Sequence, residues 1–158
     1  MSAIETHLHL WPLFVTVMPR EAGIDDLRAY FASVTRLYER RERFATLVET
    51  SDVRSIPGAA ERRFIADYQN ATIDDIRRYN VFTATVVPST LVRGAMTALN
   101  WLFKPPNEQI TVAGFGEGLS VCVEKLRADG APIPVELERL AFRGSSVTVK
   151  DIRRAGAA

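Results

Sequence analysis

Two histidines near the start of the chain are the first residues whose type and spacing could do chemistry. His7 and His9 stand two residues apart in a segment rich in aromatic and β-branched residues. On a strand, both imidazoles would lie on one face and could begin a metal site. Closing that site needs a third ligand, and the chain has no other histidine. A carboxylate could serve, but nothing in the sequence selects one, so we expect no metal site.

A glycine-rich stretch, Gly114-Phe115-Gly116-Glu117-Gly118, is the second candidate. It follows an expected strand and opens an expected helix, where backbone amides can cradle a phosphate group. It departs from the G-x-G-x-x-G dinucleotide fingerprint, which stands early in a chain with an acidic residue about 20 positions later. We expect ordinary turn glycines, with positive φ at one or two of them. Gly114, Gly116 and Gly118 remain an alternative ligand loop.

The sequence shows no machinery for nucleophilic catalysis. It contains neither G-x-S-x-G nor a Walker A motif, and Ser51, Ser55 and Ser89 have no nearby histidine in sequence. Its single cysteine, Cys122, lies in an apolar stretch where a buried, inert thiol is expected. One cysteine forms no internal disulfide, which favours a reducing compartment and a cytoplasmic location. We expect no cofactor and no enzymatic activity.

Composition favours one globular domain. The 158 residues are 47% hydrophobic, enough for a core and too apolar for wholesale disorder. Basic and acidic residues, 20 against 19, are interleaved, which argues against nucleic-acid binding. No apolar run is long enough to span a bilayer, so we expect no transmembrane segment.

The hydrophobic pattern predicts strands alternating with helices. Strands are expected at 5–10, 13–18, 44–49, 81–87 and 109–113, and helices at 24–42, 58–70, 72–79, 89–103, 117–128 and 135–142. This alternation predicts an α/β fold with a mostly parallel sheet of four or five strands layered with helices. Residues 1–130 would form this domain. Residues 131–158 would be a C-terminal extension, with a strand or extended arm at 145–149 and a frayed end at 155–158.

The order of these elements resembles the STAS domain, and especially the SpoIIAA-like group, over residues 7–128. The stretch 91–102 is also similar to a helix that recurs in bacterial SpoIIAA-like sequences. The resemblance implies a fold shared with antagonists of anti-sigma factors and no known catalytic activity.

The chain lacks the phosphorylation motif of STAS antagonists. In those proteins a D-S-[ST]-G motif follows a buried strand, and a kinase phosphorylates its serine. Phe44–Glu49 matches the strand, but the motif falls on Pro57-Gly58-Ala59-Ala60, which has no hydroxyl group. Ser51 or Ser55, just upstream, could be modified instead.

Together these features favour a non-enzymatic regulatory or scaffold module that contacts a protein partner of unknown identity. The expected helix 89–103 is apolar on almost every side, so it is either buried or covered by a partner. The interaction candidates on it are Arg93, Met96, Trp101 and Phe103. Core packing is the alternative for Trp101 and Phe103. Two copies could also pair through this helix as a homodimer.

Two other functions stay open. SpoIIAA-like folds resemble the CRAL/TRIO lipid-binding fold, so the protein could carry a lipid or another small apolar ligand. A cavity could then be lined by Trp11, Phe14, Phe31, Phe82 and Phe103. The third possibility is a nucleotide-binding enzyme that uses the glycine-rich loop 114–118.

Overall fold

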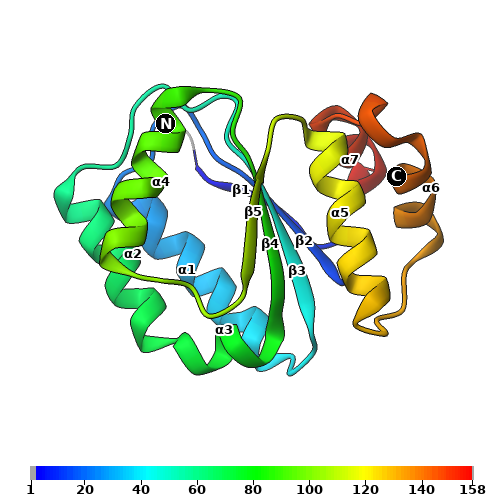
Figure 1. Ribbon diagram of the computed structural model, residues 1–158, viewed down its shortest axis with the longest axis horizontal. Helices are drawn as coiled ribbons and strands as arrows, with labels where there is room; N and C mark the ends of the chain where they lie inside the picture. The colour runs from blue at the N-terminus through cyan, green and yellow to red at the C-terminus, as the bar shows by residue number, and fades with distance from the viewer. Residues whose placement is uncertain (1–2, 158) are drawn as a thin grey trace.

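A five-stranded sheet lies between two layers of helices (Figure 1). The computed structural model describes residues 3–157, and the side chains of all of these except 98 and 100–102. The sheet order is the chain order, and β1 is antiparallel to β2 while all other neighbours are parallel. The strands are β1 (Glu5–His7), β2 (Leu13–Val17), β3 (Phe44–Glu49), β4 (Asn80–Val86) and β5 (Glu108–Val112). The predicted α/β fold with a mostly parallel sheet is confirmed.

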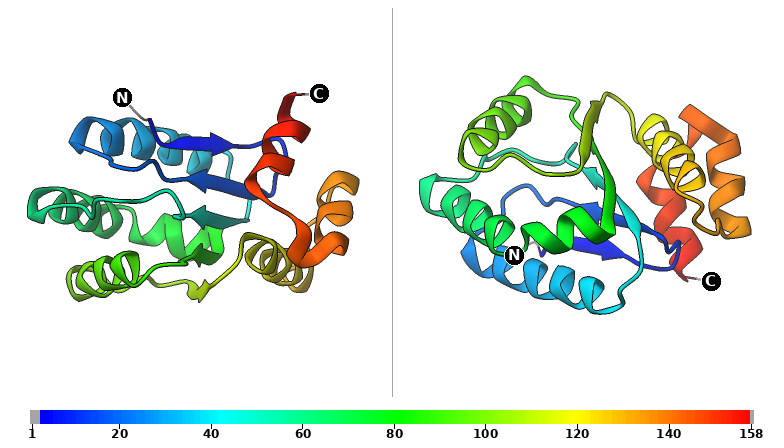
Figure 2. Two further views of the ribbon diagram at one scale, coloured as in Figure 1. Left: turned by 90° about the horizontal axis from the view of Figure 1, so that it is seen from above. Right: turned by 60° about the horizontal axis from the view of Figure 1, so that its bottom comes forward.

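Helices that connect the parallel strands all cover the same face of the sheet, and the later helices cover the other (Figures 1 and 2). The connecting helices are α1 (Ile24–Glu39), α2 (Ala59–Ala71), α3 (Ile73–Tyr79) and α4 (Thr90–Leu102). On the opposite face lie α5 (Phe115–Ala128), α6 (Val135–Arg143) and α7 (Val149–Ala157). The chain therefore winds in one direction from β2 to β5 and then crosses to the second face with α5.

Register across the sheet gives the two faces different chemistry. Residues that face α5 are almost all apolar: Leu13, Val15, Val17, Ala45, Leu47, Phe82, Ala84 and Val86. Residues between them face α1–α4 in two rows across the strands, Phe14–Thr46–Thr83–Gln109 and Thr16–Val48–Thr85–Thr111. Successive side chains of a strand point to opposite faces, so each strand contributes to both surfaces. One face is therefore apolar, and the other carries hydroxyl and amide groups.

The glycine-rich stretch belongs largely to α5 and serves packing. None of Gly114, Gly116 and Gly118 has positive φ, so that prediction is wrong. A Cβ on Gly118 would lie 2.7 Å from Leu47 Cδ1, and one on Gly116 would overlap the carbonyl oxygen of Gly144. Both glycines are buried, and they let the α5 backbone approach the sheet and the turn that follows α6. The sequence predicts a helix from residue 117, whereas the helix begins two residues earlier, at Phe115.

The C-terminal segment folds onto the body of the same chain. The sequence predicts a strand or extended arm at 145–149 and a frayed end at 155–158. Both predictions are wrong for the described residues, because a 3-10 turn at Gly144–Ser146 leads into α7, which extends to Ala157. Thr148 N donates to Asp151 Oδ2 at 2.8 Å, a side-chain cap that favours helix after it. Leu137 of α6 and Ile152 of α7 are fully buried in the core shared with the sheet.

Candidate functional site

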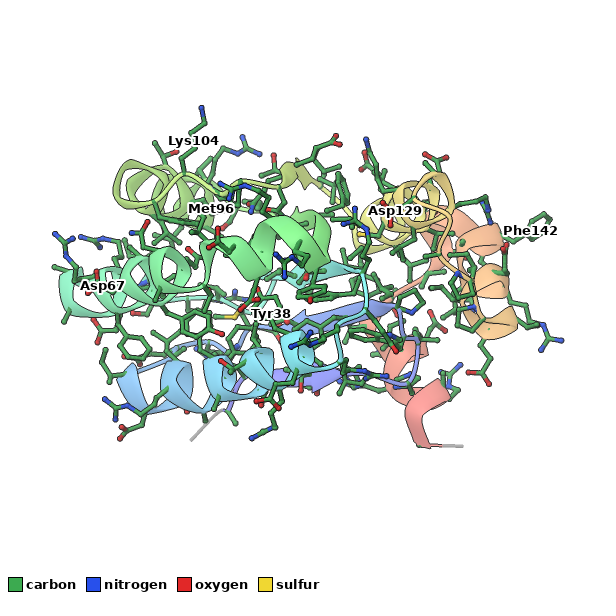
Figure 3. All side chains as sticks on the ribbon, turned by 90° about the horizontal axis from the view of Figure 1, so that it is seen from below. Tyr38, Asp67, Met96, Lys104, Asp129 and Phe142 are labelled. Carbon is green, nitrogen blue, oxygen red and sulfur yellow. The ribbon has the colours of Figure 1, made fainter. Side chains whose placement is uncertain are left out.

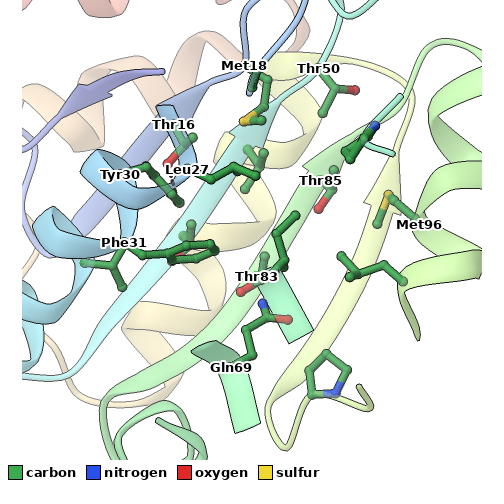
Figure 4. A pocket seen from close by; sticks show the side chains of 18 of the residues that line it. Thr16, Met18, Leu27, Tyr30, Phe31, Thr50, Gln69, Thr83, Thr85 and Met96 are labelled. Atoms are coloured by element: carbon green, nitrogen blue, oxygen red, sulfur yellow. Dashed lines mark hydrogen bonds between the residues drawn. The ribbon is translucent and has the colours of Figure 1, made fainter. Parts of the chain in front are cut away.

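A cavity of about 280 Å³ lies between the hydroxyl-bearing face of the sheet and helices α1, α2 and α4. Its volume is near the lower end of the range for small-molecule sites, roughly 300–1,000 Å³. Figure 4 shows Leu27 and Phe31 of α1 on one side and Met96 of α4 on the other, with threonines of the strands between them. The cavity therefore has a mostly apolar helical wall and a partly polar floor.

Helical periodicity explains the apolar wall. Each of the three helices turns one face inward, with residues spaced three or four apart. The inward residues are Leu27, Tyr30, Phe31, Val34 and Tyr38 of α1, Arg62, Ile65, Tyr68 and Gln69 of α2, and Val92, Ala95, Met96 and Leu99 of α4. The wall is therefore a direct product of the amphipathic patterns of these helices.

Some polar groups of the floor are already paired within the protein. The hydroxyl groups of Thr16 and Tyr30 lie 3.0 Å apart and share a hydrogen bond (Figure 4). Asn107 Nδ2 donates to Thr83 Oγ1 at 3.2 Å. Such pairing lowers the cost of keeping polar atoms in a partly dry space. These groups hold the floor in place.

Apart from the exposed Ser55, two other polar side chains that line the cavity have no hydrogen-bond partner among the described residues. They are the hydroxyl of Thr85, a residue 7% exposed, and the amide of Gln69. Figure 4 shows them on opposite sides of the Thr83 position, with Gln69 reaching toward the strands from α2. A bound molecule with hydrogen-bonding groups could use both.

The described lining of the cavity carries few ionisable side chains. Among the described lining residues there is no carboxylate, imidazole or thiol. Burial raises the pKa of the Tyr30 phenol to about 12, so this group stays protonated near neutral pH. One formally charged side chain lines the described cavity, the guanidinium of Arg62.

Of the five aromatic residues predicted to line a cavity, three line this one, and Trp11 lines a separate pocket beside Arg43 and Asp129. The three are Phe14, Phe31 and Phe103. Phe82 faces α5 because its register partner is Ala45, so the alternation of β4 turns it away. Trp11 lies in the turn before β2, where the guanidinium of Arg40 sits 4.0 Å from its ring centroid.

The interaction candidates on α4 fall in different environments. Arg93 is exposed, whereas Met96 lines the cavity. Phe103 is 4% exposed and packs in the core between the sheet and α1–α3, so core packing is the correct alternative for it. The side chain of Trp101 lies outside the described residues.

The two candidate modification sites lie in the loop between β3 and α2. Ser51 donates through both its backbone N–H and its hydroxyl to Oε1 of the buried Glu49. Ser55 is exposed at the cavity lining, and its N–H donates to the carbonyl oxygen of Arg20 at 3.2 Å. The Ser51 hydroxyl is thus occupied by a structural contact, while Ser55 is the more open of the two.

His7 and Cys122 take structural positions, whereas His9 lies exposed in the turn after β1, not on a strand with His7. His7 Nε2 lies 3.1 Å from Glu5 Oε2, and Arg153 of α7 contacts the same carboxylate. In the described part of the chain, no three His, Cys, Asp or Glu side chains gather as a metal site would require. Cys122 is fully buried, and burial raises the pKa of its thiol to about 12, so the expectation of a buried, inert thiol is confirmed.

Four residues of the cavity are not among those predicted from the sequence: Thr83, Thr85, Gln69 and Arg62. The signal for the threonines was present, because Thr83-x-Thr85 places two hydroxyls on one face of a strand that otherwise reads as apolar. Arg62 and Gln69 stand seven residues apart, which on a helix places them on one face.

No protein-family model matches the chain, and no curated protein matches it. Within residues 3–157, none of the helices combines the length and apolar character needed to cross a membrane. Function must therefore be inferred from the cavity and from the surface.

Proposed function

We propose that the protein reversibly binds a small, largely apolar molecule in the cavity and acts as a carrier or as a ligand-responsive domain. The observation that carries this proposal is the space itself, about 280 Å³ between the sheet and three helices. Protein interiors are normally packed close to crystal density, so a space of this size beside a well-packed core is a local exception. Its apolar wall suits the body of a ligand.

The polar floor supports specific binding over a simple packing defect. Empty cavities in proteins are usually lined by apolar groups alone. Here Thr85 and Gln69 present hydrogen-bonding groups without a described protein partner. A ligand with hydrogen-bonding groups could pair with both. The absence of proton-transfer groups among the described lining residues favours binding without reaction.

Dye binding tests this proposal directly. Nile red, an uncharged apolar dye, should bind at one site, and Ala95→Phe should weaken its binding about tenfold or more by filling the cavity from α4. Ala32→Phe makes the same change at an exposed position of α1 and should leave binding unchanged. Leu99→Trp is a second filling variant, and circular dichroism verifies the fold of each. Binding that is absent, or equal in all variants, would overturn the proposal.

A second candidate, contact with a protein partner, is favoured by the surface of α6. Phe142 is 94% exposed and Val135 is 65% exposed, and they stand seven residues apart on this helix. Figure 3 shows Phe142 pointing away from the body of the protein. Large exposed apolar side chains on one helix face are typical of contact surfaces. We propose this surface, in place of α4, for the regulatory or scaffold role that the STAS resemblance implies.

Light scattering tests the self-association form of this second candidate. If two copies pair through α6, the mass of a concentrated sample should approach that of a dimer, and Phe142→Glu should restore a monomer. Ala32→Glu, which adds one negative charge at an exposed position of α1 away from α6, is the matched control. A strict monomer at high concentration would exclude the homodimer.

A further inference from the structure

The one charged side chain of the described cavity lining stands apart from the other arginines of the protein. Every other described arginine is exposed, whereas Arg62 is half-buried. Its Nη1 donates to the carbonyl oxygen of Pro57 at 2.7 Å, which fixes the guanidinium beside the loop between β3 and α2. A guanidinium has five N–H donors, so most of its hydrogen-bonding capacity remains for another acceptor.

No described carboxylate lies within ion-pair distance of Arg62. The neighbouring Glu61 instead places its carboxylate against Gly58, at the start of α2. Exposed arginines such as Arg43 and Arg153 each pair with a carboxylate at 2.8–3.0 Å. A positive charge taken partly out of water without a counter-ion is unfavourable. Arg62 is therefore a half-buried positive charge without a described counter-ion, and an anion bound in the cavity would stabilise it.

We propose that the ligand is an amphiphile with a single anionic head group, and that Arg62 binds this head. The inference rests on the proposed function and specifies its ligand class. Arg62 lies in the first turns of α2, next to the carboxyl ends of the parallel strands, where open α/β sheets commonly bind ligands. The apolar body of the ligand lies among Phe31, Met96 and the other wall residues. A carboxylate or a phosphate head would use the same two-pronged geometry of arginine.

Competition with bound Nile red tests the head group. Decanoate, decyl phosphate and 1-decanol share one chain and differ in the head. We expect the preferred anion to displace the dye at a concentration about tenfold or more below that of decanol. Whichever anion displaces the dye at the lower concentration identifies the head as carboxylate or phosphate.

Substitution of the arginine completes the test. Arg62→Gln should weaken the preferred anion about 10- to 100-fold and leave decanol unchanged, because a hydrogen bond to a charged group is lost. Arg63→Gln removes a charge from the exposed neighbouring position and should change neither. If Arg62→Gln does not fold, the wild-type protein supplies the readout, since raising the salt concentration about tenfold should weaken the anion and spare decanol.

The outcomes separate the two proposals. If decanol and the anions displace Nile red equally well and Arg62→Gln has no effect, the cavity still binds apolar molecules and the anionic head is wrong. If Nile red does not bind at all, the proposed function fails and the inference fails with it.

Discussion

The two faces of the sheet are built from alternate residues of the same strands, yet one is closed and the other holds a cavity. On the closed face, Gly118 brings α5 so near that a Cβ would contact Leu47 and Val112. On the cavity face the strands present threonines, and the facing helices present large aromatic side chains. Small residues permit close approach of backbones, whereas large ones hold them apart.

The helical layer over the cavity is stabilised from within. Phe31 of α1 stacks on Tyr68 of α2 with 4.3 Å between ring centroids, and the hydroxyl groups of Thr35 and Tyr68 lie 2.8 Å apart. Aromatic pairs of this kind contribute about 0.5–1.5 kcal/mol beyond the area they bury. Because these contacts stabilise α1 and α2 against each other, the helical layer does not depend on close packing against the sheet. A cavity can thus persist beside a well-packed core.

Truncation of one leucine on each side of the sheet should give the largest difference. Leu119 of α5 is fully buried on the closed face, and we expect Leu119→Ala to lower the free energy of unfolding by about 3–5 kcal/mol. Leu99 of α4 already borders the cavity, so Leu99→Ala should cost about 1–2 kcal/mol. Urea denaturation measures both. Equal costs would show that the cavity face is as tightly packed as the other.

Enlargement of a small residue should also be tolerated better on the cavity face than on the closed face. Gly118→Leu should lower the free energy of unfolding by about 2–3 kcal/mol, because α5 must move off the sheet to admit the side chain. Ala95→Leu enters the cavity and should change it by less than about 0.5 kcal/mol, or raise it. Thermal denaturation of the two variants compares them. A large loss at position 95 would mean that the space is not available to a side chain or a ligand.

The strands and the parallel sheet could be predicted from sequence, but the difference between the faces could not. Phe44–Glu49 is recognisable as a buried strand because it is almost uniformly apolar. An almost uniformly apolar strand does not reveal which of its residues face α5. Register with the neighbouring strands places Ala45 and Leu47 on that face. The cavity depends on how far α1 and α4 stand from the sheet. Such distances result from packing between segments far apart in sequence.

The last helix, α7, shows a different kind of failure, whereas the helix predicted at 135–142 is present as α6. Thr148-Val149-Lys150-Asp151 carries the spacing of a capping box, a signal for helix that was present in the sequence. The β-branched residues of the same stretch favoured a strand instead. The side-chain cap from Asp151 decides between them in the folded chain. The half-buried Arg62 is harder to foresee, because its environment is created by the neighbouring loop and by α4.

Removal of single hydroxyl groups should have smaller effects, of opposite sign for two threonines. Thr85→Val removes a hydroxyl that has no described partner, and we expect it to raise the free energy of unfolding by up to about 0.5 kcal/mol. Thr50→Val removes the hydroxyl that donates to the carbonyl oxygen of Val86 and should lower it by about 1 kcal/mol. Denaturant midpoints for the pair test this. A loss at Thr85 as large as at Thr50 would reveal a hydrogen bond within the protein.

The smallest expected effect is a pH dependence. The free energy of unfolding should fall at acid pH through an ion pair at the end of α5, whereas the affinity of the cavity for a dye should not change with pH. Arg43 donates through Nε and Nη2 to the two carboxylate oxygens of Asp129, each at 2.8 Å, and so ties the chain before β3 to the end of α5. These bonds hold the pKa of Asp129 below its usual value. A depressed carboxyl pKa gives stability that is present above the unfolded-state value and is lost as pH falls through the folded-state value.

Asp129→Asn should therefore lower the free energy of unfolding by less than about 1 kcal/mol near neutral pH, since the pair is partly exposed. The difference from wild type should shrink below about pH 4, where the wild-type carboxylate becomes protonated. Urea midpoints at neutral and acid pH measure it, with Asp67→Asn on the exposed side of α2 as the control.

Nile red binding should stay constant between about pH 5 and pH 8, because no described group that lines the cavity titrates there. A midpoint difference that grows toward acid pH would contradict the assigned sign, and a titrating dye affinity would place an undetected ionisable group beside the cavity.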